Sequence, residues 1–196
     1  MSRTATRSRQ TKETTISCTV NLDGTGASSI QTGVGFLDHM ITALARHGRL
    51  DITLTCAGDL HIDDHHTAED CALTLGATIL DALGDRRGIA RFGYAYAPLD
   101  EALARAVVDL SGRPWPIVEL GFTREMLGGI ATENLTHFLN SLAIAGRMNL
   151  HVDVIRGDND HHKVEAAFKA VAQALRAAVR QDAADDRVPS TKGVLE

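Results

Sequence analysis

An internal repeat constrains the fold of this 196-residue chain more than any other feature of its sequence. Residues 36–54, FLDHMITALARHGRLDITL, resemble residues 134–152, NLTHFLNSLAIAGRMNLHV, at a shift of 98 positions. At this shift His39 aligns with His137, and apolar positions align with apolar positions. A repeat on this scale is a whole supersecondary unit, so the sequence predicts two similar half-domains.

Each copy is predicted to begin with an amphipathic helix that leads into a strand. Apolar residues within 37–44 recur at offsets of 0, 3, 4 and 7, and the aligned positions of the second copy are also apolar. These offsets lie on one stripe of a helix. A glycine, Gly48 or Gly146, then ends each helix, and alternating apolar residues beyond it predict a strand.

Each copy continues into a second helix, which opens with DHHTAE at 64–69 and with DHHKVE at 160–165. Asp64 and Asp160 are predicted N-cap residues, because a carboxylate accepts hydrogen bonds from the free amides of the first turn. The predicted fold class is α+β, with two repeated half-domains that pack helix to helix. Each half-domain is a small mixed sheet with two helices on one face. Further strands are predicted near residues 14–22, 27–32, 92–97, 103–110 and 116–120.

The chain divides into three predicted segments. Residues 1–12 hold four basic residues, no acidic residue and no apolar block, which predicts a disordered basic tail. The first half-domain is assigned to residues 13–90. The second half-domain is assigned to residues 91–196, and it ends in a C-terminal segment that is a candidate for substrate binding.

Composition and missing motifs exclude several classes of protein. A net charge of −5 and an aromatic content of 4% argue against a nucleic-acid binder. Cys18, Cys56 and Cys71 show no CxxC spacing, which argues against a disulfide framework or a cysteine zinc site. No apolar run approaches the length of a membrane span. No glycine-rich nucleotide loop occurs, so no nucleotide cofactor is expected.

The two HHxxE motifs point to metal binding. On a helix, His65 and Glu69 are four residues apart and reach one point, whereas His66 is turned further round, toward a different ion. The same holds for the second motif. Imidazoles with carboxylates and no thiolate suit manganese, iron, cobalt or zinc. The predicted ligands are His39, His65, His66, Glu69, His137, His161, His162 and Glu165.

A pair of histidines at a helix start is more often solvated surface than a metal site. Two copies, each with a glutamate at the same offset and a histidine 24 to 26 residues upstream, favour the metal interpretation. His47, His61 and His151 lie outside this pattern and are expected in surface or loop positions.

Several cations are candidate contacts for an anionic group. Lys169 lies one turn beyond Glu165 and roughly 10 Å along the helix from the metal end, whereas the first copy has Leu73 at that position. This offset fits a small ligand with a metal-binding head and an anionic tail, and the alternative is a solvated helix lysine. Arg91, Arg113 and the segment 189–193 are further candidates.

The motifs GVGFLDHM (33–40), DDHHTAED (63–70), DLSGRPW (109–115), DNDHHKVEAAFKA (158–170) and VPSTKG (188–193) are similar to those of the imidazoleglycerol-phosphate dehydratase family. The resemblance runs from about residue 11 to the C-terminus. It implies a cytoplasmic hydro-lyase of histidine biosynthesis that converts D-erythro-imidazoleglycerol phosphate to imidazole acetol phosphate. It also implies two manganese ions per active site and a fold like ribosomal protein S5 domain 2. The family forms a 24-subunit shell built from trimers, with its metal sites between subunits.

The resemblance carries roles onto particular residues. Its metal ligands are the eight named above, and Glu13 and Glu165 are its candidate catalytic bases. The implied substrate contacts are Glu13, His39, Arg91, Arg113, His161, Lys169, Thr191, Lys192 and Gly193.

The substrate chemistry agrees with this assignment. The C–H bond to be broken is not adjacent to a carbonyl group, so an imidazolate ring must first expel hydroxide to give a diazafulvene-like intermediate. A carboxylate can then remove the acidified proton. Two alternatives stay open from the residues alone: a dinuclear metal hydrolase, and a non-catalytic metal-binding shell protein.

Overall fold

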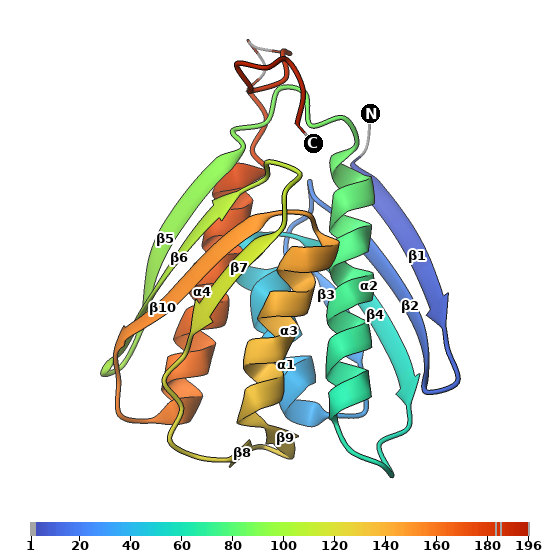
Figure 1. The fold of residues 1–196 in the computed structure, drawn as a ribbon, viewed down its shortest axis with the longest axis vertical. Coiled ribbons are helices and arrows are strands. Elements are labelled where there is room, and N and C mark those ends of the chain that lie inside the picture. The colour runs from blue at the N-terminus through green and yellow to red at the C-terminus, as the bar shows by residue number, and fades with distance from the viewer. Residues whose placement is uncertain (1–2, 183, 185, 196) are drawn as a thin grey trace.

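Two sheets with the same strand order flank a central layer of helices (Figure 1). The computed structural model describes residues 3–182, 184 and 186–195. The strand orders are β1-β2-β4-β3 and β5-β6-β10-β7, and in each sheet only the last pair is parallel. The predicted duplication and the α+β class are therefore confirmed.

The first half-domain contains β1 (Thr4–Gln10), β2 (Thr14–Asn21), β3 (Ser28–Gln31), α1 (Gly35–Gly48), β4 (Asp51–Gly58) and α2 (His65–Leu83). The second contains β5 (Phe92–Leu99), β6 (Ala102–Asp109), β7 (Trp115–Glu119), α3 (Thr132–Ala145), β10 (Asn149–Arg156) and α4 (Asp160–Ala178). A short hairpin, β8 (Met126–Leu127) and β9 (Ile130–Ala131), precedes α3.

The two halves pack through their helices, as predicted. Helix α2 lies against α3 and α4 lies against α1, while α2 also covers β1 and β2, and α4 covers β5 and β6. Close approach depends on Gly76 of α2, because a Cβ there would lie 2.4 Å from the carbonyl oxygen of Leu142 in α3. The apolar stripes of the helices form the core between the sheets, where the ring centroids of Phe138 and Phe168 lie 5.7 Å apart with the rings tilted by 34°.

The prediction of a disordered tail is wrong for residues 4–10, which form β1 and pair with β2. Residues 1 and 2 lie outside the described residues. Strand β1 lacks an apolar pattern because Arg7 and Arg9, on the side facing α2, form ion pairs with Asp81 and Asp70 of that helix. These ion pairs replace the apolar contacts by which a half-buried strand is usually recognised.

The helix N-caps also differ from the prediction. Asn159, not Asp160, caps α4, because its side chain accepts a hydrogen bond from the His161 amide. Asp160 is instead a buried residue of the first turn, and it accepts hydrogen bonds from the amides of Thr123 and Arg124. Asp64 occupies the predicted cap position of α2, but its side chain makes no capping hydrogen bond.

Candidate metal centres

Two groups of possible metal ligands form where helices of different half-domains meet. His39 of α1 lies with His161 and Glu165 of α4. His137 of α3 lies with His65 and Glu69 of α2. Within each group the candidate ligand atoms are all within 4.8 Å of one another. Each histidine of a first helix therefore joins the HHxxE motif of the other copy, and not the motif downstream in its own copy.

Distances within the groups suit ligands that share one ion. The Nε2 atoms of His39 and His161 lie 3.1 and 3.2 Å from Oε2 of Glu165. In the other group, His137 Nε2 lies 3.1 Å from Glu69 Oε1. Neighbouring ligands on one ion, each about 2.0–2.2 Å from it, are roughly 3 Å apart. The residues present therefore fit a divalent ion in each group.

The two groups orient their histidines differently. His65 Nδ1 lies 2.9 Å from Asn134 Oδ1, and the Asn134 amide donates to Asp64, which leaves Nε2 of His65 free for a metal. The repeat aligns Asn134 with Phe36. The ring of Phe36 contacts His161 edge to face, with centroids 5.1 Å apart. One imidazole is thus held by a hydrogen bond and its counterpart by an aromatic contact.

The second histidine of each motif lies outside the two groups, as its position on the helix predicts. His66 Nδ1 is 3.1 Å from Asp59, and His162 Nδ1 is 2.7 Å from Glu101. Each hydrogen bond raises the pKa of its histidine. It also fixes the ring so that Nε2 points outward, the usual arrangement of a carboxylate behind a metal-binding histidine.

Glu13, the predicted catalytic base, lies in the turn between β1 and β2. Its Oε1 is 3.7 Å from Nε2 of His66, and half of its side chain is exposed. Glu101 occupies the same place in the turn between β5 and β6, next to His162. No motif in the sequence singles out Glu101. A shift of 88 residues relates it to Glu13, and recognising β1 as the counterpart of β5 would have revealed that shift.

Lys169 contacts the metal group directly and does not stand apart from it. Its Nζ lies 2.8 Å from Oε1 of Glu165. Burial opposes ionisation of Glu165, but hydrogen bonds from Lys169 and His39 outweigh burial and lower its pKa to about 2.

His47, which was expected at the surface, lies close to Lys169 and Glu165. Burial and the nearby Lys169 ammonium lower the pKa of His47. His47 follows His39 by eight residues and lies along the same side of α1. This spacing could have predicted that His47 lies near the candidate metal group.

The remaining predicted substrate contacts gather at another end of the molecule. Arg91 donates to both oxygens of Asp109, at 2.7 and 3.1 Å, and to the carbonyl oxygen of Pro189 at 2.9 Å. It therefore ties the C-terminal segment to the start of β5. Arg113, in the loop after β6, is exposed. Thr191, Lys192 and Gly193 are also exposed.

The metal groups and this cationic end are far apart. The Arg91 amide donates to the carbonyl oxygen of Ala178, the last residue of α4, whereas His161 is the second residue of that helix. At 1.5 Å per residue the two positions are about 26 Å apart along the axis. In Figure 1 the C-terminal segment lies at the opposite end of the molecule from the starts of α2 and α4.

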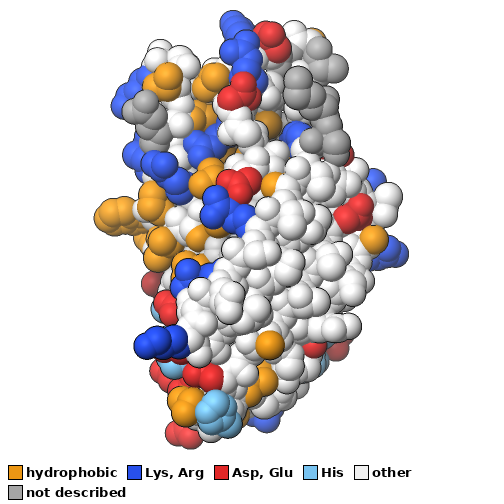
Figure 2. Space-filling view, turned by 90° about the vertical axis from the view of Figure 1, so that its right-hand side faces the viewer, with side chains coloured by type: hydrophobic (Ala, Val, Ile, Leu, Met, Phe, Trp, Pro, Cys, Tyr) orange, Lys and Arg blue, Asp and Glu red, His pale blue; other side chains and the backbone are white. Residues whose placement is uncertain are grey.

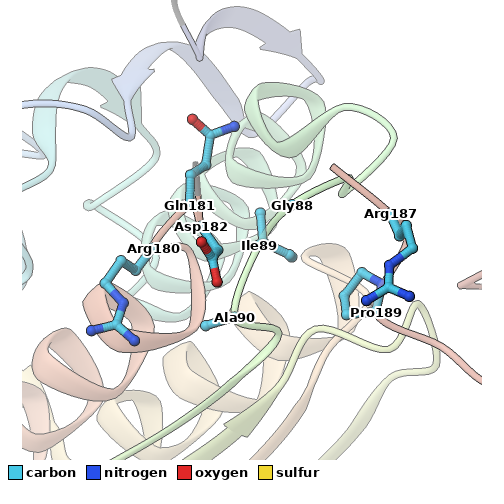
Figure 3. Close-up of a pocket in the computed structure, with 8 residues that line it drawn as sticks. All are labelled: Gly88, Ile89, Ala90, Arg180, Gln181, Asp182, Arg187 and Pro189. Atoms are coloured by element: carbon cyan, nitrogen blue, oxygen red, sulfur yellow. The ribbon is translucent and has the colours of Figure 1, made fainter. Parts of the chain in front are cut away.

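A cavity of about 380 Å³ lies between the loop Gly88–Ala90 and the C-terminal segment (Figure 3). Among the described residues that line it there is no predicted metal ligand. A shallower hollow of about 430 Å³ is lined by His65, Asn134 and His137. The candidate chemistry is therefore at an open surface of this chain and not inside a closed pocket.

These features define the class: a duplicated α+β protein with two histidine–carboxylate groups, of the kind that bind divalent metals in enzymes. Residues 32–175 match the family model described as "Imidazoleglycerol-phosphate dehydratase". The chain belongs to this family of hydro-lyases, which act in histidine biosynthesis.

Individual relatives agree with this assignment. The chain is 59% identical to imidazoleglycerol-phosphate dehydratase of Phytophthora nicotianae over 98% of its own length and 42% of that protein. It is 56% identical to that of Cereibacter sphaeroides (strain KD131), over 98% of its length and all of the relative. These matches include part of residues 1–12, which the family resemblance had left out.

A solved structure supports the fold. The crystal structure of the Staphylococcus aureus enzyme superimposes with a TM-score of 0.83 at 36% identity, covering 91% of this chain and 99% of that one. None of the helices in the described part of the chain is long and apolar enough to cross a membrane.

Proposed function

We propose that this protein catalyses the manganese-dependent dehydration of D-erythro-imidazoleglycerol phosphate to imidazole acetol phosphate in the cytoplasm. We further propose that it works at sites formed between copies of the chain in a 24-subunit shell. When bound, manganese would supply the positive charge that stabilises the substrate ring in its deprotonated form. The donor sets support two such ions, because each group offers two imidazoles and a carboxylate but no thiolate.

The observation that carries this proposal is the separation of about 26 Å between the metal groups and the cationic end. An imidazole and a phosphate joined by a three-carbon chain span only about 8 Å at ordinary bond lengths. No single copy can therefore hold both ends of this substrate through His161 and Arg91. A site that combines the metal end of one copy with the cationic end of another brings them together.

Within that site, His66 and His162 would complete the metal coordination of a neighbouring copy through their outward Nε2 atoms. Glu13 would remove the proton from the carbon next to the one that loses hydroxide, because it is half exposed and lies beside His66. Glu165 is the second candidate base. Its Oε2 faces the two imidazoles and would bind the metal, while Oε1 holds the Lys169 ammonium beside the site, where it would meet the substrate phosphate.

Arg91 would act mainly by holding the C-terminal segment in place, since Asp109 already pairs with its guanidinium. Thr191, Lys192, Gly193 and Arg113 would then contact the phosphate. Charge-assisted hydrogen bonds of this kind contribute about 1.5–3 kcal/mol each.

A turnover assay tests the reaction. With added manganese and no nucleotide, the protein should convert imidazoleglycerol phosphate to imidazole acetol phosphate without releasing inorganic phosphate. Phosphate release without the ketone would indicate a dinuclear metal hydrolase instead. Metal binding without turnover of this substrate would indicate a non-catalytic metal-binding shell protein.

Mixed assemblies test whether the site is shared. His161→Ala damages the metal end and Arg113→Ala damages the cationic end, so each variant alone should be nearly inactive. When the two are co-expressed, sites that combine two intact ends should form, and activity should recover to at most about a quarter of wild type for random mixing. Co-assembled particles that stay as inactive as the separate variants would contradict a shared site.

A further inference from the structure

A buried chain of hydrogen bonds lies behind one of the two candidate metal groups. We name each group after the helix that carries its glutamate: the α2 group is His65, Glu69 and His137, and the α4 group is His39, His161 and Glu165. The chain of hydrogen bonds runs from Asp64 through Asn134 to His65. The side-chain amide of Asn134 donates to Oδ2 of Asp64 at 3.1 Å, and its Oδ1 lies 2.9 Å from Nδ1 of His65. Asn134 is only 4% exposed, so the protein shields this chain from water.

The direction of these hydrogen bonds fixes which ring nitrogen of His65 carries the proton. A carboxylate can only accept, so the amide nitrogen of Asn134 must face Asp64 and its carbonyl oxygen must face the imidazole. Nδ1 of His65 therefore donates, and Nε2 keeps its lone pair. Asp64 is held in turn by the Ala131 amide at 2.8 Å. The imidazole is thus fixed in the tautomer and the orientation that a divalent ion needs.

The α4 group is built without such a chain. Phe36 occupies the aligned position of Asn134, and a phenyl ring offers no lone pair to a ring N–H group. Asp160, the counterpart of Asp64, accepts hydrogen bonds from the loop before β8 instead. No described residue forms a hydrogen bond with Nδ1 of His161, and 45% of that side chain is exposed. Its ring must therefore lose rotational freedom when an ion binds.

We propose that Asn134 is a positioning residue for metal binding, and that it makes the α2 group bind a divalent ion more tightly than the α4 group. This inference rests on the metal binding proposed above and adds an order to it: the α2 group fills first. A hydrogen-bond partner behind a metal-binding histidine typically changes metal affinity by about 10- to 100-fold. A difference of this size is expected between the two groups.

The charge beside each group acts in the same direction. Nζ of Lys169 lies 2.8 Å from Oε1 of Glu165, so an ion on Oε2 of that carboxylate has an ammonium group close to it. Two positive charges at this range repel one another, which weakens metal binding to the α4 group. Leu73 occupies the equivalent position beside the α2 group and adds no charge there.

Access from solvent does not distinguish the two groups. The histidine that each group takes from a first helix is partly exposed, 48% for His39 and 36% for His137. Figure 2 shows histidine and acidic side chains at the lower end of the molecule, the end where α2 and α4 begin in Figure 1. The difference in affinity therefore arises from the residues around the ligands and not from the route to them.

A manganese titration tests the order of binding. The metal-free protein is titrated without substrate, and electron paramagnetic resonance measures the free manganese, which gives the number and the affinity of the sites per chain. The wild type should show two classes of site whose affinities differ by about 10-fold or more. His65→Ala should remove the tighter class, and His161→Ala should remove the weaker class.

Substitution of Asn134 tests its role directly. Asn134→Leu keeps a similar volume but removes the acceptor, so it should weaken the tighter class by about 10- to 100-fold and leave the weaker class unchanged. Phe36→Leu, at the aligned position, is the matched control and should change neither class. Circular dichroism verifies folding, and Asn134→Ala takes the place of Asn134→Leu if that variant does not fold.

An exchange of partners separates the hydrogen bond from the shape of the side chain. In the double variant Asp64→Asn with Asn134→Asp, the new amide can donate to the new carboxylate, which still accepts from Nδ1 of His65. The tighter class should therefore return to at least its wild-type affinity, because a carboxylate behind a metal-binding histidine is a common arrangement.

Other outcomes overturn the inference. Two equal classes in the wild type would show that the groups are equivalent, and loss of the tighter class in His161→Ala would reverse their order. If Asn134→Leu weakened both classes alike, or if the exchange of partners failed to restore the tighter class, Asn134 would act through the fold and not through His65. Two equal manganese sites with normal turnover would remove only this inference, whereas a protein that binds no manganese would remove the proposed function as well.

Discussion

The two half-domains share their strand order and their HHxxE motifs, but they differ around those motifs. In the second half, Lys169 pairs with the candidate ligand Glu165, whereas the first half has Leu73 at the equivalent position. The turns between the first two strands of each half are closely matched, since Glu13 and Glu101 both lie beside the second histidine of a motif. The two halves thus share their candidate metal ligands, but a lysine contacts the candidate ligand glutamate in only one of them.

The packing of helix on strand differs as well. In the second half a Cβ at Gly93 of β5 would lie 1.9 Å from the carbonyl oxygen of Ala174, so α4 lies directly on the strand. In the first half Arg7 and Arg9 of β1 extend to α2. A glycine in the strand allows the helix to approach closely. Long arginine side chains keep the strand and the helix further apart, and their ion pairs connect the two.

Loss of either metal group should have the largest effect. His65→Ala and His161→Ala should each reduce turnover by about 10³-fold or more, since a lost metal removes several kcal/mol of transition-state stabilisation. Elemental analysis should find fewer bound manganese ions per chain than in the wild type. His61→Ala, in an exposed loop, is the control. If only one of the two substitutions lowered turnover and manganese content, the two groups would not both be metal sites.

Substitution of Glu13 should affect catalysis, whereas substitution of Glu101 should affect metal binding. Glu13→Gln should lower kcat by about 10²–10⁴-fold with normal metal content, the usual scale for losing a general base. Glu101→Gln should lower manganese affinity by about 10–100-fold, because Glu101 orients His162, and excess manganese should restore its activity. Near-normal turnover in Glu13→Gln would make Glu165 the base to test next.

Exchanging the residues at positions 73 and 169 tests the difference directly. Lys169→Leu should raise KM about 10- to 100-fold while metal content stays normal, because one charge-assisted contact to phosphate is lost. Leu73→Lys should leave KM unchanged. Kinetic titration with substrate measures both. If Lys169→Leu and Leu73→Lys changed KM equally, the lysine would not account for a functional difference between the two half-domains.

The smallest effect is expected in β1. Arg9→Ala should lower the free energy of unfolding by about 1 kcal/mol, because it removes a partner of Asp70, whose side chain is 6% exposed. Arg7→Ala should change it less, since both Arg7 and Asp81 are well exposed. Urea unfolding of the assembled protein measures both. No change in either variant would mean that the ion pairs of β1 contribute nothing to holding the strand.

Sequence alone determined the duplication, the α+β class, the helix faces and the residue types of the candidate metal groups. Each of these follows from local periodicity or from a motif repeated along the chain. The family resemblance also followed from short motifs. The cationic residues Lys169, Arg91 and Arg113 were found in the same way, but only as separate candidates.

Tertiary structure decided which of these residues meet. His39 joins Glu165 and not Glu69 because α1 packs against α4, and helix pairing depends on the whole core and not on one helix. Strand β1 was hidden because its inward residues are arginines that find their partners only in the folded protein. Without β1, the correspondence of Glu13 with Glu101 was also hidden. The sequence does not reveal how far the candidate metal ligands lie from Arg91, because that distance is set by the 19-residue helix α4, which separates them within one chain.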